Sequence, residues 1–421
     1  MEKKRIKAVS LISGGLDSML ATKMMLEQGI HVEGINFFTG FCVEGHTHAI
    51  RKQDKEKQKR NNSLYVAEQL GIKLHIIDVI EEYKDVLLNP KYGYGANMNP
   101  CLDCKIFMVR KAKEWAKENG FDFIITGEVI GQRPMSQRKS TMPVVQKQSG
   151  VDDLLLRPLS AKNLPETKPE REGWVDRSKL MGITGRGRKD QMRIAREWGI
   201  EDYASPAGGC CFLTDKQYSD KLVDLWQARN SKEYEFDDIM LLKVGRHIRY
   251  KPEYKLIIGR EEGENNYLNG YKNQFTHVYG SSHQGPLILI DGDFEKADED
   301  FTAQILGRFT QGKNAESVTM VFNYLDGTSK EVVVKPMPAD EIKKRVVYIM
   351  QQLNLERLLC PMPVIKTQNA LKAMQSGEQL KVVCTDPGTM HDIPAWCKVN
   401  DYILVKAEQV VDKYEFIIEV K

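Results

Sequence analysis

The sequence predicts an α/β protein with a parallel sheet in its first half, a strand-rich middle part and a small α/β two-layer sandwich at the end. Apolar runs alternate with helical spacing in the first half, and such alternation produces a parallel sheet covered on both faces. The pattern changes near residue 235 to short alternating segments, and a compact unit starts near Leu355. We therefore expect three domains, at residues 1–230, 235–340 and 354–421.

Each element of the first half has its own local signal. Leu16, Leu20 and Met24 recur at helical spacing behind a glycine turn, which predicts a helix up to Gln28. The Pro-, Glu- and Lys-rich stretch at 158–173 indicates a surface loop. The expected strands are 6–12, 31–38, 73–79 and 121–126, and the further expected helices are 55–71, 105–119 and 178–199.

Composition excludes several classes of protein. The chain has 421 residues, of which 41% are hydrophobic and 28% charged, which is typical of a globular protein with several domains. No run approaches the roughly 18 apolar residues of a membrane helix, and the first residues lack a signal-peptide apolar region. We expect a cytoplasmic protein with no membrane partner. The net charge of +3 means that any nucleic-acid surface must be a local patch.

A glycine turn between the first strand and the first helix is the strongest local signal. Its main-chain amides and the positive helix end can converge on an anion, and Asp17 makes chemical sense beside phosphates if Mg²⁺ neutralises it. An ordinary glycine turn with a serine cap is the alternative. The turn reads Ser13-Gly14-Gly15-Leu16-Asp17-Ser18.

This hexapeptide resembles the loop of the PP-loop ATP pyrophosphatases, whose sheet is of the HUP (adenine nucleotide alpha hydrolase-like) type. The resemblance spans about residues 5–215 and implies Mg²⁺, ATP and adenylation of a substrate oxygen. Thr126-Gly127-Glu128, Gly131-Gln132 and Ser136-Gln137 look like a segment of the tRNA 4-thiouridine synthetases, whereas 2-thiouridylases usually place histidine at Glu128. The implied nucleotide-binding residues are Ser13, Gly14, Gly15, Asp17, Ser18, Asn36, Phe37, Gly127 and Gln132.

The eight cysteines are too sparse for a disulfide scaffold, but four of them form two groups. Cys101 and Cys104 open a predicted helix, where a thiolate is favoured, and Cys210 and Cys211 follow about a hundred residues later. Resemblance to tRNA thiolases implies either a persulfide relay between the groups or a 4Fe-4S cluster with one open iron. Structural Zn²⁺ on all four thiols is the alternative. Cys42, Cys384 and Cys397 are assigned to packing.

A basic stretch in the middle part combines cations with aromatic rings, which suits RNA binding. A solvated strand face is the alternative. The stretch from Val244 to Asn266 resembles an NFACT-R type region of RNA-handling proteins, and Arg186, Arg188 and Lys189 form a second basic cluster. The basic and aromatic side chains of the stretch are Lys243, Arg246, His247, Arg249, Tyr250, Lys251, Tyr254, Lys255 and Arg260.

The last unit contains Cys360-Pro361-Met362-Pro363 at the start of a predicted helix. The prolines suit the first helical turn, and the helix dipole is expected to favour the Cys360 thiolate. The segment resembles the TusA/SirA sulfur carriers, in which this cysteine accepts sulfur as a persulfide. A buried, inert cysteine is the alternative.

These features together predict an ATP-dependent RNA sulfurtransferase that acts on tRNA and receives sulfur from a cysteine desulfurase or another persulfide donor. The predicted catalytic residues are Asp17, Cys101, Cys104, Cys211 and Cys360. Two alternatives remain open at this point: adenylation of a small molecule, as in 7-cyano-7-deazaguanine synthesis, and a non-enzymatic sulfur-trafficking or RNA-binding scaffold.

Overall fold

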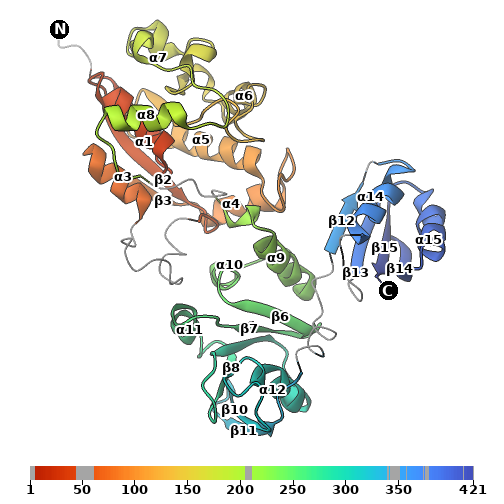
Figure 1. The fold of residues 1–421 in the computed structure, drawn as a ribbon. Helices are drawn as coiled ribbons and strands as arrows, with labels where there is room; N and C mark the ends of the chain where they lie inside the picture. The colour runs from red at the N-terminus through yellow and green to blue at the C-terminus, as the bar shows by residue number, and fades with distance from the viewer. Residues whose placement is uncertain are drawn as a thin grey trace. The chain divides into compact units, whose positions relative to one another are not determined.

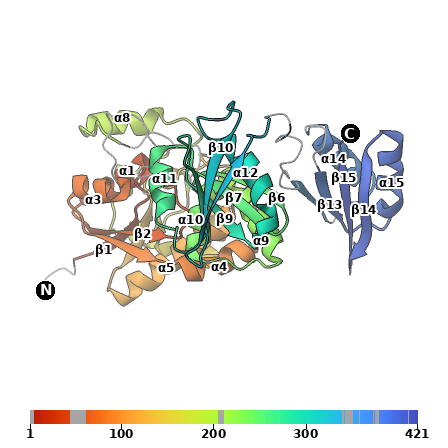
Figure 2. The same ribbon diagram turned by 90° about the horizontal axis from the view of Figure 1, so that it is seen from below.

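The computed structural model describes residues 5–43, 61–203, 211–338, 341, 351–356, 358–372, 374, 379–410 and 412–420. The chain forms two compact units, one of residues 1–219 with 232–243 and the other of residues 220–231 with 244–421. Three sheets organise them (Figures 1 and 2). Within the described residues, no helix combines the length and apolar character needed to cross a membrane.

The first unit is built on a parallel sheet, as predicted. Its strand order is β3-β2-β1-β4-β5, so β1 lies in the middle between β2 and β4. The β4 residues are all buried, as the apolar character of a central parallel strand requires. The strands are β1 (Lys7–Leu11), β2 (His31–Phe38), β3 (Leu74–Asp78), β4 (Phe123–Thr126) and β5 (Leu155–Leu156).

Helices and short 3-10 turns surround this sheet. The core of the unit lies between β1, β4 and the buried side chains of α1, including Leu16, Leu20 and Met24. The α-helices are α1 (Leu16–Leu26), α3 (Asn62–Leu70), α4 (Ile80–Leu88), α5 (Cys101–Glu118), α6 (Met142–Ser149), α7 (Lys168–Arg171), α8 (Lys189–Glu197) and α10 (Phe236–Leu241). The helix α9 (Lys216–Arg229) begins in this unit and continues into the second one.

Two helices differ in extent from their prediction. The helix expected at 178–199 is α8 alone, because Gly185 adopts a φ of +90° and the chain before Lys189 is turn and 3-10 structure. The helix expected at 55–71 is described only as α3, since residues 55–60 lie outside the described part.

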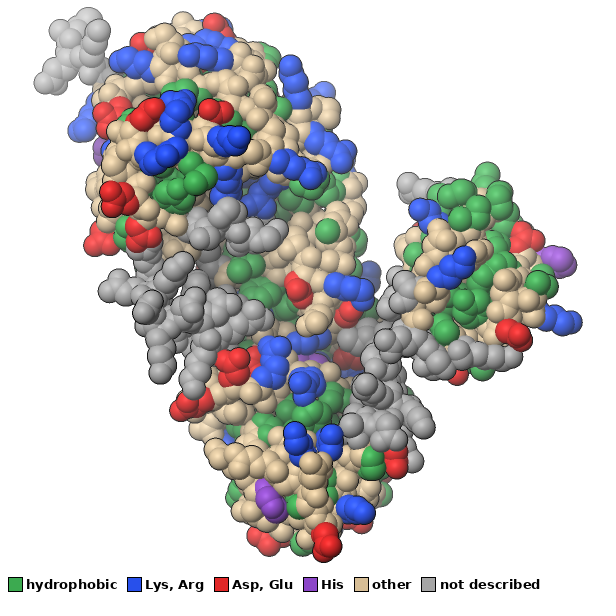
Figure 3. All heavy atoms as spheres, in the orientation of Figure 1, with side chains coloured by type: hydrophobic (Ala, Val, Ile, Leu, Met, Phe, Trp, Pro, Cys, Tyr) green, Lys and Arg blue, Asp and Glu red, His purple; other side chains and the backbone are tan. Residues whose placement is uncertain are grey.

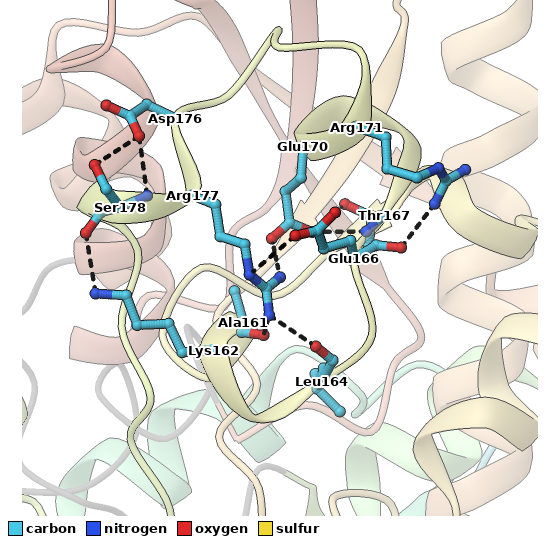
Figure 4. A network of polar contacts seen from close by, with 10 residues as sticks. All are labelled: Ala161, Lys162, Leu164, Glu166, Thr167, Glu170, Arg171, Asp176, Arg177 and Ser178. Carbon is cyan, nitrogen blue, oxygen red and sulfur yellow. Dashed lines mark hydrogen bonds and ion pairs between the residues drawn. The ribbon is translucent and has the colours of Figure 1, made fainter.

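The stretch predicted as a surface loop is held by a polar network (Figure 4). Arg177 pairs with Glu170 and donates to the carbonyl oxygens of Ala161 and Leu164, both at 3.0 Å. The Thr167 amide donates to Glu170 at 2.7 Å and begins α7 with a capping box. This network fixes the chain between β5 and α8.

The middle part of the second unit is a six-stranded antiparallel sheet in the order β11-β10-β8-β9-β7-β6. Its core packs α12 against β10 and β11. The elements are β6 (Arg246–Lys251), β7 (Tyr254–Ile258), α11 (Glu262–Asn269), β8 (Thr276–Gly280), β9 (Ile288–Gly292), α12 (Glu299–Gly307), β10 (Val318–Asn323) and β11 (Ser329–Val334).

The C-terminal part is the predicted two-layer sandwich, with a sheet in the order β12-β13-β15-β14. The helix α15 follows a turn in which Thr389 Oγ1 donates to the Asp386 carbonyl at 2.6 Å, and it continues through Pro394. The elements are β12 (Gln351–Leu355), α14 (Met362–Leu371), β13 (Gln379–Cys384), α15 (Thr389–Val399), β14 (Ile403–Val410) and β15 (Lys413–Glu419).

Candidate active site

The predicted phosphate loop lies at the carboxyl end of β1, where the strand order reverses between β2 and β4. Ligands bind at such switch points in open α/β sheets. Gly14 has a φ of +73°, which a glycine adopts without strain. Ser18 Oγ donates to the Gly15 carbonyl at 2.8 Å, so this hydroxyl braces the turn. The hexapeptide therefore forms a tight turn at the start of α1.

Asp17 is the charged group of this turn. Its Oδ2 accepts from Gln132 Nε2 at 2.8 Å and lies 3.7 Å from Arg188 Nη2. Its Oδ1 is buried and has no hydrogen-bond partner among the described residues. Burial raises the pKa of Asp17, although Arg188 and Gln132 oppose that increase. A buried carboxylate oxygen without a partner fits a cation ligand.

The segment after β4 packs directly on the loop. Gly127 has no room for a side chain, because a Cβ there would lie 2.5 Å from the Ser18 nitrogen. Glu128 is buried and accepts from Thr126 at 2.8 Å and from Arg157 at 3.1 Å. Burial would raise the pKa of Glu128, but the nearby positive charges and these hydrogen bonds hold it below its usual value. Glu128 thus fixes the segment as an anion.

Two of the predicted nucleotide-binding residues, Asn36 and Phe37, belong to β2. The Asn36 amide donates to the Ile12 carbonyl at 2.7 Å and to Ser63 Oγ at 3.1 Å, which ties β2 to the strand that precedes the loop. Phe37 is buried, with 6% of its surface exposed. Asn36 therefore supports the loop, while Phe37 offers little free surface.

The cysteines of the first unit do not all meet. Cys101 donates to Ser136 Oγ at 3.2 Å, whereas Cys104 hydrogen-bonds Tyr83. Burial raises the pKa of Tyr83, and the charges of Cys104, Cys211 and Cys42 raise it further. Cys104 therefore contacts Tyr83, Cys211 and Cys42 act on this tyrosine through their charge, and Cys101 lies beside Ser136.

The predicted metal ligands lie only partly within the described residues. Cys210 is outside them. Among the residues that are described, no group of three or more His, Cys, Asp or Glu side chains is arranged to hold a metal ion. A metal on the four predicted thiols stays a prediction.

Cys360 has an environment opposite to the one expected. Its amide donates to Asp386 Oδ2 at 2.7 Å, at the start of α14. Burial raises the pKa of the Cys360 thiol to about 12, and Asp392 and Asp386 add to that increase. The expectation that the helix dipole favours the thiolate is therefore wrong for the carrier by itself, because two carboxylates outweigh the helix end.

The predicted RNA-binding stretch is also corrected in part. Lys243 and Lys255 are buried, as is Tyr254, so they present no contact surface. Lys255 Nζ lies 3.3 Å from Asp291 Oδ2, and Arg249 pairs with Asp224 at 2.6 Å. The alternating charges of this stretch thus form internal ion pairs, while Arg246 and Arg260 stay exposed.

Lys and Arg side chains also gather on the face of the first unit that carries α8 (Figure 3). Lys189, Arg193 and Arg196 are exposed on this helix. Arg188 precedes them in the chain, but its guanidinium lies 3.7 Å from Asp17 and is therefore part of the surroundings of the phosphate loop.

Known families match the chain in three places. Residues 4–164 match the family described as Thiamine biosynthesis protein (ThiI), residues 245–346 the NFACT protein RNA binding domain, and residues 351–420 Sulfurtransferase TusA. The chain carries a ThiI-type, an NFACT-type and a TusA-type region, in that order. The predicted resemblances and their order are thereby confirmed.

Individual relatives and one solved structure are similar to parts of this chain. The tRNA-specific 2-thiouridylase MnmA of Petrotoga mobilis is 25% identical over 356 residues, which cover 80% of this chain and 88% of the relative. The MnmA of Campylobacter curvus is 31% identical over 129 residues, or 30% of this chain and 35% of the relative. A 4-thiouridine synthetase solved with RNA and ATP is 22% identical, covers 50% of this chain and 46% of its own, and has a TM-score of 0.34.

The sequence alone does not reveal two residues of the first unit that lie at the candidate site. It places Arg188 on an RNA surface and gives Cys42 a packing role. Cys42 follows the end of β2, and the carboxyl ends of parallel strands are where ligands gather, so its position was a usable signal. The sequence gives no sign that Tyr83 lies near the cysteines, because an aromatic residue on an amphipathic helix is typical of a hydrophobic core.

Proposed function

We propose that this chain is an ATP-dependent sulfurtransferase that acts on tRNA, activating a base carbonyl oxygen as its adenylate and replacing it by sulfur. The observation that carries the proposal is the partly buried Asp17 carboxylate, whose buried Oδ1 lacks a partner among the described residues, in a glycine turn at the switch point of the sheet. The same unit holds Cys104 and Cys211. The relatives named as tRNA thiouridylases and the TusA match support the sulfur chemistry.

The turn residues have separate tasks in this reaction. The main-chain amides of Gly14 and Gly15 and the start of α1 bind phosphate oxygens. Asp17 Oδ1 would hold Mg²⁺, which would neutralise phosphate charge and make pyrophosphate a better leaving group. Arg188, which lies beside Asp17 and immediately precedes α8, contacts the phosphates. Gln132 keeps the carboxylate oriented through its hydrogen bond to Oδ2.

Sulfur reaches this site through the TusA-type region. A cysteine desulfurase or another persulfide donor loads Cys360, whose terminal sulfur is then attacked by the thiolate of Cys211. The bond between that sulfur and Cys360 breaks, and Cys360 leaves as a thiolate that takes up a proton. The Cys211 persulfide then attacks the activated carbon, and AMP leaves with the former carbonyl oxygen.

A metal centre on the predicted cysteine ligands is the alternative to the persulfide relay. A 4Fe-4S cluster on Cys101, Cys104 and one of Cys210 and Cys211, or Zn²⁺ on all four thiols, would replace the persulfide relay at this point. Iron, zinc and sulfide analysis of anaerobically purified protein tests it. The steps above use thiols alone and do not pass through a metal centre at the cysteines.

Pyrophosphate release from ATP tests the proposal when it is measured with and without unmodified tRNA, together with mass spectrometry of the tRNA nucleosides. We expect tRNA to stimulate release in the wild type and in Asp190→Ala, an exposed carboxylate on α8, and not in Asp17→Ala. Stimulation by small acids alone would favour adenylation of a small molecule. Absence of release with either substrate would favour a scaffold and contradict the proposal.

A further inference from the structure

Cys42 lies beside the thiol site. It follows β2 at the carboxyl end of the parallel sheet, and its side chain is partly buried. Thr39 Oγ1 lies 3.5 Å from Cys42 Sγ. Cys42 is therefore a partly exposed thiol with a polar neighbour, and this environment differs from that of a cysteine packed in an apolar core.

Cys42 and Cys211 form a cross-strand pair. They face each other in an isolated antiparallel bridge, and neither cysteine is in a disulfide. The Phe212 amide donates to the Phe41 carbonyl at 2.9 Å, so the two cysteines occupy the non-hydrogen-bonded kind of pair. In such pairs the Cα atoms lie about 4.5 Å apart and the side chains are close. Disulfides join Cα atoms about 4.4 to 6.8 Å apart, so a bond between these thiols needs little main-chain movement.

A buried cation accompanies the pair. Lys243 is 6% exposed, donates to the Gly40 carbonyl, and lies 4.9 Å from the centre of the Phe212 ring. Burial lowers the pKa of Lys243 to about 8, while Cys42 and Cys211 act in the opposite direction. Lys243 and the two cysteines therefore influence one another electrostatically.

Cys104 is placed differently. Its thiol hydrogen-bonds Tyr83, which is 1% exposed and packs against Phe41 and Phe107. Cys104 belongs to α5 and has no backbone bridge to Cys211 among the described residues. The pairing geometry thus favours Cys42 over Cys104 as the direct partner of Cys211.

We propose that Cys42 is the thiol that releases the transferred sulfur from Cys211. This inference rests on the proposed function and adds a catalytic residue to it. After the Cys211 persulfide has joined the base carbon, the Cys42 thiolate attacks Cys211 Sγ and a disulfide forms. The bond from Cys211 Sγ to the transferred sulfur breaks, and its electron pair stays on that sulfur as the thiocarbonyl group. The Cys42 proton goes to water, and an external dithiol reduces the disulfide for the next turnover.

Disulfide mapping tests the pairing without any substrate. The full chain carrying Cys210→Ser, which removes the neighbouring thiol from the same peptide, is treated with diamide and digested without reductant. We expect mass spectrometry to find residues 42 and 211 linked, and linked equally when Cys101→Ser is added as a control. A link between residues 104 and 211, or no link to residue 211, overturns the proposal.

Trapping tests the chemical step. With persulfide-loaded protein, ATP and unmodified tRNA, Cys42→Ser should accumulate a protein–RNA adduct that dithiothreitol cleaves, and should make thiolated tRNA at least tenfold more slowly than the wild type. Cys42→Ala should behave in the same way. Normal turnover without an adduct in both variants would overturn the role of Cys42. If the wild type itself makes no thiolated tRNA, the proposed function fails, while disulfide mapping still decides the pairing.

Discussion

Gly127 lies directly against the main chain of Asp17. A Cβ at Gly127 would be 2.4 Å from the Asp17 carbonyl carbon, a separation that real side chains essentially never show. The obstacle is backbone, which cannot rotate away as a long side chain can. The segment after β4 therefore closes on the phosphate loop only because this position has no side chain.

Replacing Gly127 by alanine should displace the loop. We expect Gly127→Ala to lower the free energy of unfolding by about 1–3 kcal/mol, as forced overpacking does, and to weaken ATP binding at least tenfold. Urea unfolding and calorimetric titration with ATP measure the two effects. Gly187→Ala is the matched control, since its added Cβ meets no atom within 4 Å. Unchanged ATP affinity in Gly127→Ala would show that the contact does not shape the site.

Removing the charge of Asp17 should separate stability from binding. Because burial is the main cause that raises the pKa of Asp17, the folded protein holds its proton more strongly than the unfolded chain does. The stability from this group is complete below the unfolded pKa of about 3.9 and is lost as the pH rises through the higher folded value. Asp17→Asn should therefore be more stable than the wild type at pH 7 and lose this advantage below pH of about 4.

The same variant should no longer bind magnesium ATP. Thermal unfolding at several pH values, with and without magnesium ATP, measures both properties of Asp17→Asn. We expect the nucleotide to raise the melting temperature of the wild type alone. A variant that is less stable than the wild type at pH 7 would indicate that the carboxylate is well compensated without a cation.

The order of strands and helices in the ThiI-type region was predictable, because apolar runs and glycine turns are local signals. β2 and β3 lie within a residue of their expected bounds. The start of the helix expected at 178–199 was not predictable. Gly185 has a positive φ that keeps the chain before Lys189 out of the helix, and the spacing of apolar residues does not reveal this conformation. The helix α15 is not favoured by its own sequence, because proline usually breaks a helix and Pro394 lies inside this one.

The candidate site was predictable where one segment carries it and less so where distant segments meet. The loop from Ser13 to Ser18 needs only its own sequence. The neighbours of Asp17 and the pairing of Cys42 with Cys211 come from residues more than 100 positions apart. The prediction that the basic stretch contacts RNA was wrong for Lys255 for a related reason. The spacing of charges does not show that this lysine is buried between carboxylates.

Removing a carboxylate near Cys360 should make its thiol more reactive. Next to burial, Asp392 contributes most to the raised pKa of Cys360, which is about 12. We expect Asp392→Asn to shift the pH profile of Cys360 alkylation to lower pH, with about tenfold more thiolate at neutral pH for each pKa unit lost. Iodoacetamide labelling followed by peptide mass spectrometry measures the rate.

The control for this prediction is Asp412→Asn, which removes an exposed carboxylate from the same region. Its alkylation profile should match that of the wild type. An equal shift in both variants would mean that the net charge of the region, and not the contact with Asp392, sets the Cys360 pKa.

Lys255 should matter for folding and not for RNA contact. Its side chain is 2% exposed, and its Nζ lies 3.3 Å from Asp291 Oδ2 and 4.0 Å from Asp224 Oδ2. Lys255→Met leaves these carboxylates without their buried partner, so we expect the free energy of unfolding to fall by about 3–5 kcal/mol. Urea unfolding measures the loss, and Lys313→Met, at an exposed lysine, should change it by less than about 0.5 kcal/mol. If Lys255→Met instead kept its stability and lost tRNA affinity in a filter-binding titration, the lysine would be an RNA contact and its burial between the carboxylates would not explain its presence.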